Sequence, residues 1–243
     1  MKEKKVVYGL IGFGGMGKWH TEILANVPEI QLAGIYDINE EKRNKAAKMG
    51  FHVYESEQEI LDAPDIDVIL IATPNDSHKP IAIKAMLAGK NVISEKPVTI
   101  SVADLGEMEE AARKTGKLLT VHQNRRWDED FLMVRKVMEE HTLGHVFRIE
   151  SRVHGSRGIP GDWRKEKKHG GGMVLDWGVH LLDQILCITG KRKLLTVYAS
   201  LTYITNQEVD DGFTVLLKFE GNMEVLVEVG TNNFAALPRW YVL

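Results

Sequence analysis

The first half of the chain alternates short apolar runs with segments rich in Ala, Lys and Glu. The apolar runs predict strands and the segments between them predict helices. The predicted strands cover residues 6–11, 31–36, 51–54, 68–72, 91–94 and 118–122. Helices are expected at about 16–26, 40–49, 57–61, 77–88 and 101–115. Strands that alternate with helices predict a doubly wound sheet of six parallel strands.

The rhythm changes after residue 124. A helix is predicted at 131–140, a strand at 145–154, a glycine-rich loop at 155–172 and a helix at 174–188, followed by strands at 194–204, 212–220 and 223–230. In the last two strands every second residue is apolar, whereas the opposite face is half polar (Leu216 and Leu226 with Lys218, Glu224 and Glu228). The sequence therefore predicts an α/β chain with a doubly wound parallel-sheet domain at 1–124 and an α+β domain, built on a mostly antiparallel open sheet, at 125–243.

Composition narrows the possible partners. The 243 residues carry a net charge of −3, and the basic clusters are short and scattered, so no nucleic-acid partner is expected. No apolar run approaches the length of a membrane span and no secretory leader is visible, so we expect a cytoplasmic protein without a membrane partner. Cys187 is the single cysteine, which excludes an internal disulfide and a cysteine metal cluster. Its apolar, helical surroundings predict a buried thiol, and no metal is expected.

Residues 6–17 join an apolar strand to the pattern G-x-G-x-x-G. Gly12 permits the tight turn, Gly14 lets the backbone approach a pyrophosphate, and Gly17 lets the next helix pack on the strand. The N–H groups at the start of that helix can bind the phosphates. Asp37 closes the second apolar run twenty residues after Gly17, where a carboxylate can accept hydrogen bonds from the adenosine ribose. Strand, glycines, helix and acid together predict a dinucleotide site. Residues 1–124 are therefore predicted to be a Rossmann dinucleotide-binding domain, and residues 125–243 the α+β substrate domain.

Asp37 also bears on the choice between NAD and NADP. A carboxylate about 4 Å from a 2′-phosphate is repelled by about 4 kcal/mol at an effective dielectric of about 20. Ile38 and Asn39 offer no adjacent cation, although Arg43 lies one helical turn further on. We therefore predict NAD as the cofactor, with NADP less favoured.

Two polar segments follow strands at the edge where a doubly wound sheet binds its ligands. The turn at 72–78 places Thr73 and Asn75 along the expected cofactor path, although a plain turn with a helix cap would have the same composition. The second segment, 94–97, contains Lys96 and Pro97. A lysine at a strand end is commonly a solvated surface residue. Placed beside the nicotinamide, it can instead stabilise a substrate oxygen that gains negative charge.

The third polar segment opens with three glycines at 170–172 and continues into an apolar helix. Asp176 and His180 are four residues apart, and Asp183 extends the row, so on an α-helix they share one face. An aspartate can orient a histidine and raise its basicity, although such pairs are also common in purely structural roles. The glycines favour function, and we expect Lys96, Asp176 and His180 to share one crevice.

These pieces together resemble the Gfo/Idh/MocA oxidoreductase family, and the resemblance covers essentially the whole chain. It implies hydride transfer between a nicotinamide and a hydroxyl or carbonyl of a sugar, inositol or related polyol. Lys96 would stabilise the oxyanion, His180 would be the general acid–base, and Asp176 would orient it or bind substrate. The implied cofactor contacts are Gly12, Phe13, Gly14, Gly15, Met16, Gly17, Asp37, Thr73, Pro74, Asn75, His78, Glu95, Lys96 and Asn124. The implied substrate contacts are Lys96, Arg126, Trp163, Arg164, Asp176 and His180.

Two features depart from the family pattern. Trp177 stands where the family often has an aliphatic residue, so the substrate pocket is expected to differ there. The chain ends at Leu243 in what reads as the middle of a strand, whereas family members usually continue. An unpaired strand edge favours association, so we expect a homodimer or homotetramer that uses the C-terminal sheet, or else a fragment of a longer product. An NAD-using glycoside hydrolase and a non-catalytic dinucleotide or sugar sensor remain alternative functions.

Overall fold

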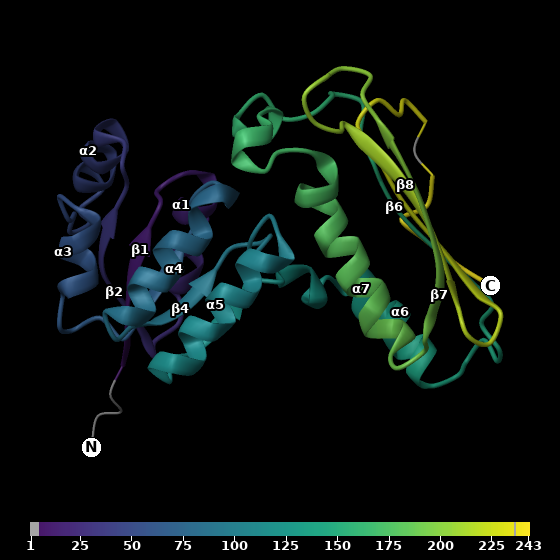
Figure 1. Cartoon of the computed structure of the whole chain (residues 1–243), viewed down its shortest axis with the longest axis horizontal. Helices are drawn as coiled ribbons and strands as arrows, with labels where there is room; N and C mark the ends of the chain where they lie inside the picture. Colours follow the sequence, from purple (N-terminus) through teal and green to yellow (C-terminus); the bar gives the residue numbers. More distant parts are fainter. Residues whose placement is uncertain (1–4, 236) are drawn as a thin grey trace. The chain divides into compact units, whose positions relative to one another are not determined.

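The computed structural model describes residues 5–235 and 237–243. The chain divides into two compact units, one ending at His122 and the other beginning at Gln123 (Figure 1). No helix within the described ranges is both long enough and apolar enough to cross a bilayer.

A parallel sheet forms the centre of the first unit. Its strands are β1 (Val6–Ile11), β2 (Ile30–Tyr36), β3 (Val68–Ile71), β4 (Asn91–Ser94) and β5 (Leu119–Val121). They lie in the order β2-β1-β3-β4-β5, and every neighbouring pair is parallel. The prediction of a doubly wound parallel sheet is confirmed, but the prediction of a sixth strand at 51–54 is wrong. In that segment only Val53 forms a bridge, to Ile35 of β2, and two backbone hydrogen bonds to Ile35 are too few for a strand.

Both faces of this sheet are buried. Tyr8 and Leu10 of β1 belong to one apolar cluster, and Ile11 belongs to the cluster on the opposite face. The covering helices are α1 (Gly15–Leu24), α2 (Glu40–Lys48), α3 (Glu57–Asp62), α4 (His78–Leu87) and α5 (Val102–Thr115), with the short 3₁₀ helix η1 (Asn75–Ser77) before α4. Side chains cap three of them at their predicted starts, because Asn39, Ser56 and Ser101 accept N–H bonds from the first turns of α2, α3 and α5.

The second unit packs helices on one face of a mixed sheet. Its helical elements are η2 (Asn124–Trp127), α6 (Glu129–Glu139), η3 (Trp163–Lys165), η4 (Lys167–His169), η5 (Val174–Gly178) and α7 (Val179–Thr189). Its strands are β6 (Arg148–His154), β7 (Leu194–Thr202), β8 (Gly212–Phe219), β9 (Met223–Gly230) and β10 (Trp240–Val242). The order is β10-β6-β9-β8-β7, with β6 and β9 as the one parallel pair among these described strands. The predicted mostly antiparallel sheet is confirmed.

The two faces of this sheet differ as predicted. The alternate apolar residues of β8 and β9 are buried beneath α6 and α7, which lie along one face (Figure 1). On the other face Tyr198 and Leu216 pair across β7 and β8, 60% and 44% exposed. Every residue of β7 is exposed.

The helix predicted at 174–188 is not regular. It begins with the π-helical turn η5 and becomes α-helical only at Val179. Asp210 fixes the start of this turn, because its carboxylate accepts the Val174 N–H at 2.9 Å and its carbonyl accepts the Met173 N–H at 3.1 Å. A π turn holds more residues than an α turn, so the spacing argument that placed Asp176 and His180 on one face does not apply directly.

The prediction of a buried thiol at Cys187 is also wrong, because the residue is exposed. Leu181, Ile185 and Ile188 form the buried stripe of α7. Cys187 lies on the opposite side beside Leu186, which is 57% exposed. The overall apolarity of this segment concealed which face was buried.

Candidate functional site

The glycine loop of the first unit has the shape that a bound pyrophosphate requires. Gly12 has φ +98°, and a Cβ there would lie 2.5 Å from the Ala72 carbonyl oxygen. A Cβ on Gly17 would lie 2.0 Å from the Gly12 carbonyl oxygen, so α1 packs against the turn. A Cβ on Gly14, in contrast, would meet no heavy atom within 4 Å. The backbone is therefore open on that side, next to the first N–H groups of α1, and the residues fit a dinucleotide phosphate.

Asp37 is tied directly to this loop. It is 5% exposed, and its Oδ2 accepts the Phe13 N–H at 2.7 Å while its Oδ1 accepts the Asn39 N–H at 2.8 Å. A cation that the sequence analysis did not consider lies beside Asp37, because Lys42 Nζ is 3.6 Å from Oδ2. Asn39 caps α2 soon after β2 ends, so Lys42 in the first turn of the helix lies close to Asp37. Arg43 donates to the carbonyls of Asp37 and Ile38.

The turn after β3 is held by a fully buried histidine. His78 Nδ1 lies 2.8 Å from the Pro97 carbonyl and Nε2 lies 2.9 Å from the Thr73 carbonyl. Burial lowers the pKa of His78, against the opposing effect of these two carbonyls. The neutral ring has one N–H and donates to one of them. His78 has no exposed surface, and Asn75 is only 3% exposed. The histidine therefore stabilises the turn from within the protein interior.

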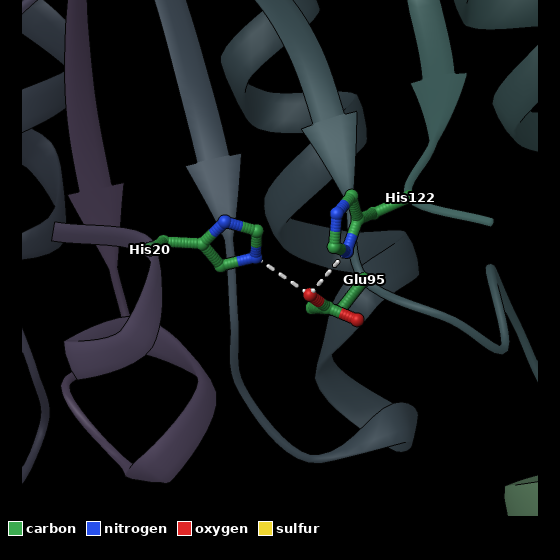
Figure 2. Close-up of side chains that lie close together, drawn as sticks. All are labelled: His20, Glu95 and His122. Carbon is green, nitrogen blue, oxygen red and sulfur yellow. Dashed lines mark hydrogen bonds and ion pairs between the residues drawn. The ribbon is translucent and has the colours of Figure 1, made fainter. Parts of the chain in front are cut away.

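Glu95, directly after β4, lies at the centre of a buried polar cluster (Figure 2). Its Oε1 lies 2.6 Å from His20 Nε2 and 2.9 Å from His122 Nδ1, and its Oε2 accepts the Lys96 N–H at 3.2 Å. Burial by itself raises the pKa of Glu95, but the hydrogen bonds and charges of His122 and His20 together lower it to about 2. The sequence analysis missed both histidines. The available signal was weak: His20 follows the glycine loop on α1, and His122 follows the last strand of the sheet.

His180 of the second unit is oriented by a residue that sequence reasoning also missed. Its Nδ1 lies 3.0 Å from Gln123 Oε1. Gln123 Nε2 donates to the Val179 carbonyl at 3.5 Å, which directs the amide oxygen toward the ring. Because that oxygen only accepts, the imidazole proton is on Nδ1, and Nε2 is the unprotonated nitrogen of the neutral ring. His180 is 4% exposed.

Asp176 lies beside a different set of predicted substrate residues. Arg164 Nε is 3.3 Å from Asp176 Oδ1, and the same guanidinium lies over the Trp163 ring at 4.6 Å. Asp176 and Trp177 help to line a cavity of about 390 Å³ whose other polar lining includes His154 and Arg157. The structure therefore brings together three predicted substrate residues, Asp176, Arg164 and Trp163.

Asp183, which was predicted to extend the row of Asp176 and His180, pairs with Arg126. Asp183 accepts two hydrogen bonds from Arg126, at 2.7 and 2.6 Å, so this arginine bridges η2 and α7. The pKa of Arg126 is raised further by that bond. Asn124 begins η2.

A parallel sheet with a glycine loop and a carboxylate after its second strand has the features of a dinucleotide-binding Rossmann fold. Comparisons with known proteins specify the class. Residues 6–123 match the model of an oxidoreductase family with an NAD-binding Rossmann fold, and residues 131–243 match the GFO/IDH/MocA C-terminal domain. The chain belongs to the Gfo/Idh/MocA family of oxidoreductases.

Three relatives illustrate the range of similarity. A crystal structure of an NAD-binding protein from Listeria innocua is 49% identical with a TM-score of 0.96, over 99% of this chain and 71% of that one. The oxidoreductase YdgJ of Escherichia coli is 36% identical over 78% of this chain and 55% of its own length. The scyllo-inositol 2-dehydrogenase (NADP(+)) IolW of Bacillus subtilis is 28% identical over 99% of this chain and 67% of its own length. The chain thus spans between half and two thirds of these two curated relatives.

Proposed function

We propose that this chain is an NAD-dependent oxidoreductase that transfers a hydride between the cofactor and a CH–OH group of a sugar, inositol or related polyol. Family membership supports the general reaction. In this proposal residues 1–124 bind the dinucleotide and residues 125–243 bind the substrate. The single observation that carries the chemistry is the Gln123–His180 hydrogen bond, which leaves His180 Nε2 as the proton acceptor.

The cofactor would be held at the glycine loop. The open side of Gly14 and the amides of α1 suit the pyrophosphate, and Asp37 suits the ribose hydroxyls. When bound, the nicotinamide supplies the carbon that accepts or donates the hydride. We propose NAD rather than NADP, because the Asp37 carboxylate would repel a 2′-phosphate, with Lys42 offsetting part of that repulsion. Titration with each cofactor tests this, and equal or tighter binding of NADP would contradict it.

The remaining roles fall on polar side chains of both units. His180 would accept the hydroxyl proton at Nε2 as the hydride leaves, and Lys96 would hydrogen-bond the substrate oxygen while its charge develops. Asp176, paired with Arg164 beside the 390 Å³ cavity, would bind substrate hydroxyls. A cavity that combines Trp177 with Asp176 and Arg157 suits a ring with one apolar face and several hydroxyls.

The test compares His180→Ala with the unchanged chain on a panel of polyols and sugars, with reduced cofactor measured by absorbance. A positioned acid–base group contributes about 10²–10⁴ in rate, so turnover should fall by that factor while NAD affinity stays the same. Glycoside cleavage without net reduction of NAD would favour the glycoside hydrolase. NAD binding without any turnover would favour the sensor.

We also propose that the outer face of the second sheet joins copies of the chain. Tyr198 and Leu216 form an exposed apolar pair there, and patches of this kind often mark interfaces. Light scattering should show a dimer or tetramer, and Tyr198→Lys should shift it to monomer. An exposed helical position, Met133→Lys on α6, is the matched control and should leave the assembly unchanged. A monomeric unchanged chain would refute the proposal.

A further inference from the structure

His20, Glu95 and His122 come from three distant parts of the first unit and meet at Glu95, the residue before Lys96. His20 lies on α1, Glu95 follows β4 and His122 follows β5. Figure 2 shows both rings pointing toward the same carboxylate oxygen of Glu95. Trp19 packs against both rings, with centroids 5.2 Å from His20 and 5.8 Å from His122.

Both oxygens of the buried Glu95 carboxylate have hydrogen-bond partners. Glu95 is 5% exposed, and an ionised carboxylate removed from water without partners would be strongly destabilising. Its Oε1 lies near two imidazole nitrogens and its Oε2 near one backbone N–H. An ionised carboxylate only accepts hydrogen bonds, so both histidines must donate to it.

The backbone N–H bonded to Oε2 belongs to Lys96. We infer that the His20–Glu95–His122 cluster is a positioning device: two histidine donors hold the Glu95 carboxylate, and that carboxylate holds the backbone of Lys96. This inference deepens the proposed function, on which it rests for the role of the Lys96 side chain. The residues that fix the position of Lys96 then include His20 on α1 and His122 after β5, outside the segment 94–97 itself.

A metal site is the rival interpretation of the same three side chains. Two imidazoles and one carboxylate form a donor set that binds zinc or iron, and their ligand atoms lie within 4.8 Å of one another. Ligands bound to one tetrahedral zinc at about 2.0 Å are separated by about 3.3 Å. The two separations here, 2.6 and 2.9 Å, are shorter and match charge-assisted hydrogen bonds. The geometry therefore favours a network without a metal.

Nitrogen-15 NMR of histidine-labelled protein separates the two interpretations without any activity measurement. The network requires a proton on Nε2 of His20 and on Nδ1 of His122. A metal would occupy those same nitrogens and move each proton to the other side of the ring. His20→Gln and His122→Asn assign the two signals. An unprotonated His20 Nε2 or His122 Nδ1, in protein as purified or after zinc addition at equal concentration, would overturn the inference.

The positioning step is tested with matched variants. His122→Asn keeps an N–H donor at the δ position, whereas His122→Leu has a similar shape and no donor. Hydrogen exchange at the Lys96 amide should accelerate about tenfold or more in the leucine variant, as expected for weakening a bond to a charged group, and return toward the original rate in the asparagine variant. If His122→Leu does not fold, His20→Gln, which keeps a donor, and His20→Met, which has none, provide the same comparison.

Turnover of the same variants is a second measurement of the positioning role. The donor-free variants should lower kcat, and the donor-keeping variants should restore it. Unchanged Lys96 exchange in folded His122→Leu and His20→Met would refute the positioning role. Altered exchange in a chain that turns over no polyol would instead refute the proposed function and leave the structural coupling intact.

Discussion

Glu95 should make the first unit sensitive to acid. Its pKa falls from 4.5 in a free glutamate to about 2 in the folded chain. At about 1.4 kcal/mol for each pKa unit, this difference stabilises the folded state by about 3 kcal/mol at pH 7. Because the folded-state pKa is the lower one, the stabilisation is complete above about pH 4.5 and is lost as the pH falls toward 2.

Glu95→Gln removes the charge with little change in shape. At pH 7 the variant should lose about 3 kcal/mol of unfolding free energy, and the gap from the unchanged chain should shrink to about half by pH 3, since the parent carboxylate becomes protonated in its unfolded state. Glu109→Gln replaces an exposed carboxylate on α5 and should have little effect at either pH.

The assay can be confined to the first unit. Trp19 is the one tryptophan in the sequence before residue 123, and it packs against His20 and His122. Urea unfolding followed by the fluorine NMR signal of 5-fluorotryptophan at position 19, assigned with Trp19→Phe, reports on this unit alone. A gap between the parent chain and Glu95→Gln that stays constant from pH 7 to pH 3 would show that Glu95 does not titrate as described.

Two further predictions concern single contacts. Lys42→Ala removes the ammonium 3.6 Å from Asp37. Competitive titration should then show NADP binding weakened by up to about fivefold relative to NAD, which is the range of an exposed ion pair. Equal losses of affinity for both cofactors would contradict this. Arg126→Met breaks the two bonds to Asp183 at a cost of up to about 1 kcal/mol, because Arg126 is half exposed. Thermal unfolding measures this loss of stability. A higher KM for the polyol in a variant that is as stable as the unchanged chain would instead indicate that Arg126 binds the substrate.

The parts of the fold that were predictable from sequence are those fixed by local pattern. The continuous apolar run at 68–72 and the alternating apolar residues of β8 and β9 indicate their burial directly. The glycine loop was predictable because its spacing is local, and Gly17 packs against the Gly12 carbonyl within the same turn. The segment 51–54 has the composition of a strand, but it pairs with β2 through one bridge, which composition does not reveal.

The site was harder to predict because its contacts are long-range. His20 and Glu95 are 75 residues apart, and Gln123 and His180 are 57 apart. No local period links such pairs, and each residue taken singly has an ordinary structural explanation. The π turn at η5 depends likewise on Asp210, which approaches from the loop before β8. Local spacing therefore selected Asp176 and His180 as candidates but did not indicate their contacts with Arg164 and Gln123.

The partner of each buried histidine determines what its ring can do. His20 and His122 donate to a carboxylate, whereas His180 donates to the neutral amide of Gln123. Gln123→Glu would place a negative charge about 3 Å from His180 Nδ1 with almost no change in shape, and a nearby anion favours the protonated ring. The acid limb of kcat/KM should then move to higher pH, by about one unit or more. Gln123→Met, which removes the hydrogen bond without adding charge, should lower turnover without that upward movement. If the acid limb is the same in Gln123→Glu as in the unchanged chain, His180 is not the group whose protonation limits the reaction.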